Sequence, residues 1–277
     1  MTGTPLISII IPSYNQGNYI GKCLQSIIDQ EQTFLNYEVI IQDNNSTDNT
    51  KLILEKYQNK KNFLIYHEKD EGQADGINKG IKKAKGQWVT WQNCDDYYLS
   101  NNAFSEIFNE IELDKNKEYG LFYGNMKLVN QRNNLQKELR FYGANSYTLA
   151  IEGMVLSNQS CFWKKSLHTK HGYLRKFRVN FDYEWFLRIS QFTKFKKINY
   201  KKPLSVFLLY DKQKSNNYSQ HEILLRSRIV KIYLKKFKIP RNYLVLKILL
   251  IISKFFRFLI LILNGDFLYL IRKTIYK

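Results

Sequence analysis

The residues that could most clearly take part in chemistry are two neighbouring carboxylates, Asp95 and Asp96. They closely follow the apolar run Trp88–Trp91. Such a run is typical of a buried strand. Adjacent acids at a strand end repel each other and add nothing to a core. A divalent cation would neutralise them, or one could bind the metal while the other accepts hydrogen bonds from a ligand's hydroxyl groups. The alternative is a solvated acidic turn.

Polar side chains also follow two earlier apolar runs, residues 6–11 and 37–42. Runs this rich in β-branched residues are typical of strands that are buried on both faces of a parallel sheet. Tyr14 and Asn15 follow the first run, and Asp43 follows the second. Acids at the ends of strands indicate function, whereas apolar strand interiors indicate only a core.

Predicted helices and strands alternate through the first 91 residues. Strands are expected at 6–11, 37–42, 62–66 and 88–91. The helices expected between them are at 20–28, 52–57 and 71–85. This alternation predicts right-handed crossovers and a doubly wound α/β sheet. Ligands of such sheets bind beyond the carboxyl ends of the strands. We therefore expect Asp43, Asp95 and Asp96 to share one cavity.

Several other classes of site are disfavoured. The glycines form no GxGxxG pattern after the first strand, and no GxxxxGK[ST] sequence occurs, which argues against a dinucleotide-binding dehydrogenase and a P-loop NTPase. The three cysteines are far apart without a CxxC pair, so neither a zinc site nor a disulfide framework is indicated. A reducing compartment fits this usage, and no secretory signal is expected at the N-terminus.

The second half of the chain has a less regular pattern. Residues 181–189 predict an amphipathic helix with Arg188 facing outward. Asp182 and Glu184 lie near its start, where acids stabilise the helix dipole, so from the residues alone they fit a plain helix start as well as a site. The other elements expected here are a helix at 103–113, strands at 121–129, 135–142, 160–163 and 204–210, and a polar loop at 212–220.

Length and charge suggest one large α/β domain with a basic appendage. The chain has 277 residues, 44% of them hydrophobic, and a formal net charge of +19. A charge of this size points to a polyanionic partner: nucleic acid, an anionic membrane surface or a phosphorylated substrate. Residues 201–277 carry 17 Lys and Arg against 3 Asp and Glu, so most of the excess lies away from the acid pair.

Residues 243–263 form a long apolar run that contains Lys247, Lys254 and Arg257. On a helix these three cations share one face. The pattern favours an amphipathic helix in the interface of an anionic leaflet. The alternatives are a helix packed on the α/β domain, a homodimer contact through the C-terminal helices, or a membrane span.

Four segments, taken together and in order, resemble the inverting family 2 glycosyltransferases of the GT-A fold. They are ISIIIPSYNQGNYI, VIIQDNNSTDNT, EGQADGINKG and QWVTWQNCDDYY, and the resemblance covers residues 7–210. It implies a doubly wound mixed sheet with a C-terminal basic amphipathic helical extension. The expected domains are a catalytic domain at 1–220, with a nucleotide-sugar half at 1–100 and an acceptor half at 101–220, and a basic helical segment at 221–277.

The resemblance also implies roles for particular residues. Asp43 would bind the nucleobase, Asp96 would ligate Mg²⁺ or Mn²⁺, and Asp182 would be the base that deprotonates the acceptor, with Glu184 as second choice. Asp95 would hold ribose or sugar hydroxyls and is the second candidate metal ligand. The remaining donor-binding residues would be Pro12, Tyr14 and Asn15 at the base pocket and Gln73, Asp75 and Asn78 nearer the sugar.

The implied reaction is transfer of a sugar from a nucleotide-sugar, usually a UDP-sugar, to a glycan or lipid-linked acceptor in surface polysaccharide biosynthesis. A peripheral position at the cytoplasmic face of the membrane would suit such an acceptor. The chain departs from the family after the last strand, where Tyr210 and Asp211 stand in place of a histidine. Lys212 or Lys214 would supply the missing charge.

Two other functions remain open. One is a non-catalytic basic protein on an α/β scaffold that binds membranes or nucleic acid, although the absence of a recognised nucleic-acid motif argues against nucleic acid as a partner. The other is a nucleotidyltransferase, which also uses paired acids and a metal. That enzyme would be expected to have a basic, glycine-rich loop near the N-terminus, and none occurs.

Overall fold

Four parallel strands and three helices build the N-terminal half, in the order that the sequence predicts. The computed structural model describes residues 4–30, 36–130, 135–198, 201–210, 213, 218–266 and 269. The strands are β1 (Ile7–Ser13), β2 (Tyr37–Asp43), β3 (Phe63–His67) and β4 (Trp88–Trp91). The helices between them are α1 (Ile20–Ile28), α2 (Thr50–Glu55) and α3 (Gln73–Lys83).

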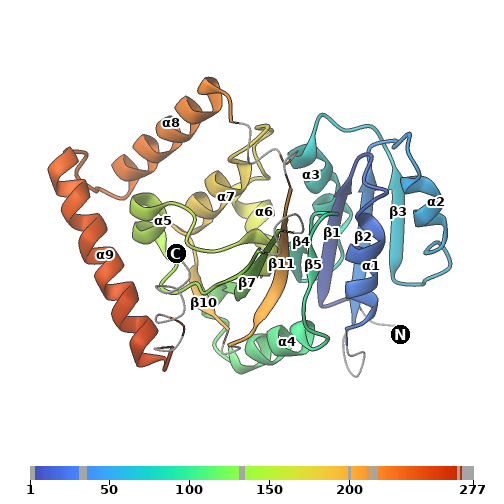
Figure 1. Ribbon diagram of the computed structural model, residues 1–277, viewed down its shortest axis with the longest axis horizontal. Coiled ribbons are helices and arrows are strands. Elements are labelled where there is room, and N and C mark those ends of the chain that lie inside the picture. The colour runs from blue at the N-terminus through green and yellow to red at the C-terminus, as the bar shows by residue number, and fades with distance from the viewer. Residues whose placement is uncertain are drawn as a thin grey trace.

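The strands of this half are buried on both faces, as their continuous apolar runs predict. Successive side chains of a strand point to opposite faces. Ile9 and Ile11 of β1 accordingly belong to the core cluster that includes α1, whereas Ile10 belongs to the cluster that includes α3. Helices therefore cover both faces, which confirms the predicted doubly wound arrangement (Figure 1).

The larger sheet has seven strands in the order β10-β6-β9-β4-β1-β2-β3. Its second-half strands are β6 (Tyr119–Tyr123), β9 (Cys161–Lys164) and β10 (Lys194–Lys197). β9 runs antiparallel to both β4 and β6, so the sheet is mixed. The smaller sheet has the order β5-β11-β7-β8, from β5 (Tyr97–Tyr98), β11 (Pro203–Leu209), β7 (Asn125–Asn130) and β8 (Leu135–Leu139).

The single strand predicted at 121–129 is two strands, and this is a correction. β6 belongs to the larger sheet and β7 to the smaller, with Gly124 between them. A Cβ at Gly124 would lie 2.4 Å from Leu204 Cδ1, so the chain crosses between the sheets where only glycine leaves room. The pattern of apolar residues in the sequence gives no sign of such a close approach.

The helices that follow α3 and precede β11 lie in the segments that connect the strands of the two sheets. They are α4 (Ala103–Leu113), α5 (Ser146–Glu152), the short 3₁₀ helix η1 (Asn158–Ser160), α6 (Ser166–His171) and α7 (Phe181–Ile189). The bounds of α4 and α7 are as predicted. Arg188 of α7 does not face outward: its guanidinium donates to Glu184 and to the carbonyls of His171 and Tyr173, because the neighbouring loop folds over it.

Two C-terminal helices, α8 (Gln220–Lys236) and α9 (Tyr243–Leu263), lie at the end of the molecule opposite β3 and α2 (Figure 1). α9 packs on α5. The buried Glu152 carboxylate of α5 accepts hydrogen bonds from Ser253 Oγ at 2.6 Å and Arg257 Nη1 at 2.5 Å. After α9, the buried Asp266 binds Arg140, which ties this end of the helix to the segment after β8.

The side chains that α9 exposes are mostly apolar. Arg257 turns inward to Glu152, whereas Lys247 and Lys254 are exposed, so the predicted cationic face is divided between the domain and solvent. No helix within the described ranges is long and apolar enough to cross a membrane. The large apolar residues exposed on α9 include Leu244, Ile248, Ile251, Ile252, Phe255, Phe256 and Leu263.

Candidate active site

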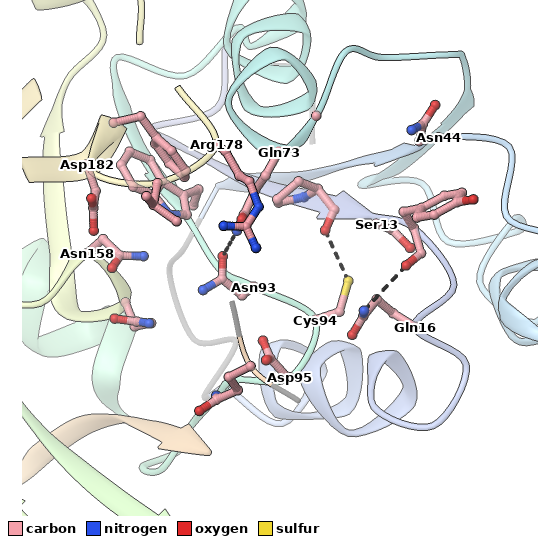
Figure 2. Close-up of a pocket in the computed structure, with 18 of the residues that line it drawn as sticks. Ser13, Gln16, Asn44, Gln73, Asn93, Cys94, Asp95, Asn158, Arg178 and Asp182 are labelled. Atoms are coloured by element: carbon pink, nitrogen blue, oxygen red, sulfur yellow. Dashed lines mark hydrogen bonds between the residues drawn. The ribbon is translucent and has the colours of Figure 1, made fainter. Parts of the chain in front are cut away.

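A cavity of about 450 Å³ opens beyond the carboxyl ends of β1, β2 and β4. Its wall begins with Pro12, Ser13 and Tyr14 at the end of β1 and continues through Asn93 and Asp95 after β4. The start of α7 and the helix η1 close the opposite side (Figure 2). The volume lies in the range of small-molecule sites in proteins. A cavity therefore lies at the edge of the sheet where the sequence predicts a ligand site.

Asp95 lines the cavity, and its carboxylate is held in place by an aromatic side chain. Tyr210, directly after β11, donates its hydroxyl hydrogen to Asp95 Oδ2 at 2.8 Å and stacks on Tyr19, with ring centroids 5.2 Å apart. Burial and the Asp95 charge raise the pKa of Tyr210, so the phenol stays protonated and donates. Tyr210 thus contacts Asp95 from the position where the sequence departs from the family that its motifs resemble.

Asp96 lies behind the cavity wall, only 1% exposed. Its carboxylate accepts hydrogen bonds from Asn93 Nδ2 at 3.0 Å, Gln159 Nε2 at 2.8 Å and the Leu208 amide at 3.2 Å. Burial and the neighbouring Asp95 charge raise the pKa of the Asp96 carboxyl. Asp96 therefore joins two remote segments, those of Gln159 and Leu208, to the loop after β4, whereas Asp95 turns toward the ligand space.

The loop after β4 is also fixed to the elements on its other side. Gln73, the first residue of α3, donates to Asn93 Oδ1 at 2.8 Å, and Cys94 Sγ donates to the Pro12 carbonyl at 3.2 Å (Figure 2). These contacts restrict the backbone that carries Asp95. A preorganised loop binds a charged ligand at a smaller entropic cost than a mobile one.

Asp43 and Asn15, which the sequence predicts at the donor site, do not line the cavity and instead support its end near β1 and β2 from behind. Asp43 is fully buried and accepts hydrogen bonds from the Ser46 amide at 3.0 Å and its hydroxyl at 2.5 Å, while His67 Nδ1 lies 2.9 Å from it. Asn15 adopts a left-handed φ of 51° and accepts a hydrogen bond from the Thr47 amide at 2.8 Å. Pro12, Tyr14 and Asn44 supply the cavity surface here.

Asp75 and Asn78 of α3 bind a neighbouring chain segment and do not line the cavity. The Asn78 side chain donates to the Leu174 carbonyl at 2.8 Å and accepts from its amide at 2.9 Å. Asp75 lies 3.0 Å from Lys176 Nζ. These contacts position the segment that leads into α7, which makes Gln73 the one predicted α3 residue on the cavity wall.

Asp182 reaches the cavity from the first turn of α7 (Figure 2). The preceding Asn180 adopts a left-handed φ of 66°, which turns the chain sharply into the helix. Asp182 is half-buried and accepts a hydrogen bond from the Tyr183 amide at 2.8 Å. Burial raises the pKa of the Asp182 carboxyl, and the Arg226 charge offsets part of the rise. A carboxylate in this environment is suited to accept a proton.

Glu184, two residues further along α7, is engaged in structural contacts. Its buried carboxylate lies 3.2 Å from Arg175 Nε and 2.9 Å from Arg188 Nη2, and it accepts a hydrogen bond from Tyr233 of α8 at 2.8 Å. These partners leave it in the helix packing and away from the cavity wall. Of the two acids predicted on α7, Asp182 faces the ligand space.

Sequence reasoning missed part of the cavity wall. The missed residues come from segments without a recognisable motif and meet only in the folded chain. Arg178 donates to Glu222 Oε1 of α8 at 2.6 Å, so the start of α8 supports this wall from behind. The predicted Asp211, Lys212 and Lys214 lie outside the described residues. The missed cavity residues include Asn158, Gln159, Arg178, Asn180, Gln213 and Tyr218.

The donor set of the cavity suits a divalent cation that a diphosphate also ligates. Asp95 offers one carboxylate to the cavity, and one or two carboxylates with substrate phosphates are a common Mg²⁺ arrangement. Within the described ranges, no group of three or more His, Cys, Asp or Glu side chains forms a complete protein site. The residues present thus fit a metal bound together with its phosphate ligand.

Comparison of the sequence with known proteins gives consistent matches. The model of the family described as "Glycosyl transferase family 2" matches residues 8–198. The chain is 31% identical over 196 residues to a chondroitin synthase of Pasteurella multocida (strain Pm70). The aligned part covers 70% of this chain and 20% of the relative. An uncharacterized glycosyltransferase of Mycoplasma pneumoniae is 40% identical over 105 residues, covering 37% of this chain and 35% of the relative. The chain thus spans a minor part of the length of these relatives.

Comparison of the structure with solved structures gives matches that cover most of the chain. S. aureus TarS (residues 1–349) in complex with UDP-GlcNAc matches with a TM-score of 0.64 at 20% identity, covering 82% of this chain and 66% of that one. A mannosyltransferase from Pyrobaculum calidifontis in complex with GDP-Man and Mn²⁺ matches with a TM-score of 0.59 at 16% identity, covering 90% and 69%. At these identities the likeness establishes a shared fold.

Proposed function

The chain belongs to glycosyl transferase family 2, and we propose on this basis that it moves a sugar from a UDP-sugar to a hydroxyl group of a glycan acceptor, with inversion. Its architecture is the GT-A fold that the sequence motifs predict. The observation that carries the proposal is the presence of Asp95 and Asp182 in one cavity, reached from opposite halves of the chain.

The donor would lie along the edge of the larger sheet. Tyr14 and Asn44 would contact the nucleobase, with Asp43 and Asn15 holding their loops from behind. The complexes of S. aureus TarS with UDP-GlcNAc and with UDP support a uridine donor. The sugar would then point toward Asn158 and Asp182 on the opposite wall.

Asp95 would hold Mg²⁺ or Mn²⁺ together with the donor diphosphate, and Asp96 would position the loop that presents it. A bound divalent cation would neutralise the diphosphate and stabilise it as a leaving group. The Mn²⁺ in the Pyrobaculum calidifontis mannosyltransferase complex supports a metal at this site. Tyr210, which donates to Asp95, would fix which carboxylate oxygen faces the metal.

Asp182 would take the proton from the acceptor hydroxyl as its oxygen attacks the anomeric carbon. The new bond joins that oxygen to the anomeric carbon. The bond from the anomeric carbon to the diphosphate oxygen breaks, and the nucleoside diphosphate leaves with the electron pair. One in-line displacement inverts the configuration. The Tyr183 amide, which donates to Asp182 in the first turn of α7, offsets part of the effect of burial on the pKa of this carboxyl.

The matches to chondroitin and hyaluronan synthases of Pasteurella multocida support a role in polysaccharide synthesis. The decisive experiment is a panel of nucleotide-sugars with Mn²⁺, in which release of nucleoside diphosphate is followed over time. We expect one UDP-sugar to be hydrolysed slowly without acceptor, and hydrolysis to stop when EDTA is added. A protein that hydrolyses and binds none of the panel would be the non-catalytic binding protein, and the proposal would fail.

We also propose that the outward face of α9 binds an anionic membrane surface. Replacing Ile251 and Phe255 by glutamine should weaken binding to anionic liposomes at least tenfold, because burial of each such side chain is worth about 1.5–3 kcal/mol. The matched control replaces Leu52 and Leu113, which are equally exposed elsewhere, and should bind as the unaltered protein does. Equal sedimentation of both variants with the liposomes would rule α9 out as the contact.

A further inference from the structure

A groove of about 810 Å³ runs between α8 and α9, beside the catalytic cavity. Apolar side chains form part of its surface: Val230 and Leu234 from α8 and Leu246 from α9. Three cations stand around them, Arg226, Lys231 and Arg241. An apolar strip edged by cations is complementary to an amphiphile with an anionic headgroup.

Within the described part of the chain, none of these three cations forms an ion pair with a carboxylate. Nearby arginines differ: Arg178 pairs with Glu222, and Arg257 pairs with Glu152. Neighbouring cations that are not neutralised by the protein repel one another, and an anionic ligand removes that repulsion. Two or more together favour a phosphoryl group over a single carboxylate.

Arg226 connects the groove to the catalytic cavity. Its guanidinium Nη1 lies 3.4 Å from Asn180 Oδ1, and its central carbon is 4.8 Å from the centre of the Tyr183 ring. Asn180 and Asp182, on either side of Phe181, both line the cavity. The Arg226 charge also acts on the Asp182 carboxyl. A headgroup at Arg226 would therefore lie next to the proposed base.

We propose that this groove binds the acceptor as a phosphoryl-linked lipid, with the headgroup on Arg226, Lys231 and Arg241 and the hydrocarbon chain on the apolar strip. The inference rests on the proposed glycosyl transfer, since it assigns the acceptor of that reaction. The hydroxyl that receives the sugar would extend from the headgroup past Asn180 toward Asp182. The lipid chain would leave the groove along α9, whose outer face is apolar.

The test measures binding of farnesyl diphosphate to the full chain in EDTA. EDTA removes divalent cations, so a metal-dependent site for diphosphate does not bind the probe. Wild-type protein should bind it, and pyrophosphate or farnesol alone should bind at least about tenfold more weakly, because each makes half of the contacts. The variant Lys231→Gln with Arg241→Gln should lose at least about tenfold in affinity, since it removes two charged contacts.

The matched control is Arg228→Gln with Lys235→Gln, two exposed cations of α8 that do not line the groove. It changes the net charge equally and should bind farnesyl diphosphate as the wild type does. Asp95→Asn should also retain binding. A diazirine analogue of farnesyl diphosphate should label peptides of both α8 and α9.

Four results would overturn the inference: equal losses in the two charge variants, loss of binding in Asp95→Asn, labelling of α9 alone, or equally tight binding of dihexanoyl phosphatidylglycerol. Equal losses in the charge variants would indicate general charge attraction, and loss of binding in Asp95→Asn would indicate binding in the donor cavity. Labelling of α9 alone would indicate contact with its outer face. Equally tight binding of phosphatidylglycerol would indicate an ordinary phospholipid site. Donor hydrolysis that persists in any of these cases would preserve the proposed function. Farnesyl diphosphate binding without donor hydrolysis would instead refute the transferase mechanism.

Discussion

Replacement of Asp182 by asparagine is expected to slow nucleotide release from the donor about 10²–10⁴-fold while leaving donor affinity unchanged, because the amide cannot accept the proton. Asparagine keeps the shape of the side chain and its contact with the Tyr183 amide. The rate at which the donor is hydrolysed without acceptor and the affinity for UDP with Mn²⁺ are measured on the same preparation. A variant that releases nucleotide at the normal rate would remove Asp182 from the mechanism.

The neighbouring acid of α7 provides the comparison. Glu184→Gln alters the other acid of this helix, whose side chain packs against Arg188 and Tyr233 and not against the cavity. We expect a loss of about 1–3 kcal/mol in the free energy of unfolding, since hydrogen bonds to a charged group are weakened. The rate of nucleotide release at a temperature where the variant is folded should stay close to normal.

The pH dependence of transfer follows from the raised pKa of Asp182. The base works in its ionised form, so activity is present above the pKa of the folded protein and falls as the pH drops through it. Because burial raises that pKa, the acid limb of kcat/KM should lie above the ordinary range of an aspartate. Donor affinity is measured at each pH, so that loss of binding is separated from loss of the base. An acid limb at or below the usual aspartate range would contradict the assignment.

Replacement of Asp95 by asparagine should reduce the affinity for UDP in Mn²⁺ by about 10²-fold, because the cation loses its charged protein ligand. In EDTA the variant and the unaltered protein should bind UDP equally weakly. The Tyr210 hydroxyl can still donate to the amide oxygen, so the loop should keep its position. Isothermal titration with and without metal measures both affinities.

Asp96→Asn is the matched variant for this prediction. Its amide group would place N–H donors against Asn93, Gln159 or the Leu208 amide, all of which donate to the present carboxylate. We expect a loss of about 1–3 kcal/mol in unfolding free energy, with the enhancement of UDP affinity by Mn²⁺ retained. If Asp96→Asn abolishes that enhancement and Asp95→Asn does not, the two roles are reversed.

The N-terminal half was predictable because local pattern and position carry most of its information. Buried parallel strands give continuous apolar runs, and polar residues just after them mark the ligand edge. Tyr14, Gln73 and Asp95 accordingly line the cavity as expected. The pattern does not give side-chain direction within a turn. It therefore could not show that Asp95 faces the ligand space while Asp96 lies behind it.

The second half was less predictable because its structure depends on long-range contacts. The sheet change at Gly124 arises from the proximity of Leu204, 80 residues away along the chain. The short helices α5 and α6 have too few turns to show a helical period. Arg178, Asn158 and Tyr218 reach the cavity from three unrelated segments, so no spacing in the sequence connects them.

The contact between Asp96 and the Leu208 amide has a consequence for synthesis of the protein on the ribosome. The two residues are 112 positions apart, and β11 must leave the exit tunnel before the bond can form. A nascent chain shorter than this can build the parallel strands of its first half, but the loop that carries Asp95 still lacks one of its anchors. We therefore expect the loop that carries Asp95 to reach its final structure late in translation, when β11 joins the smaller sheet.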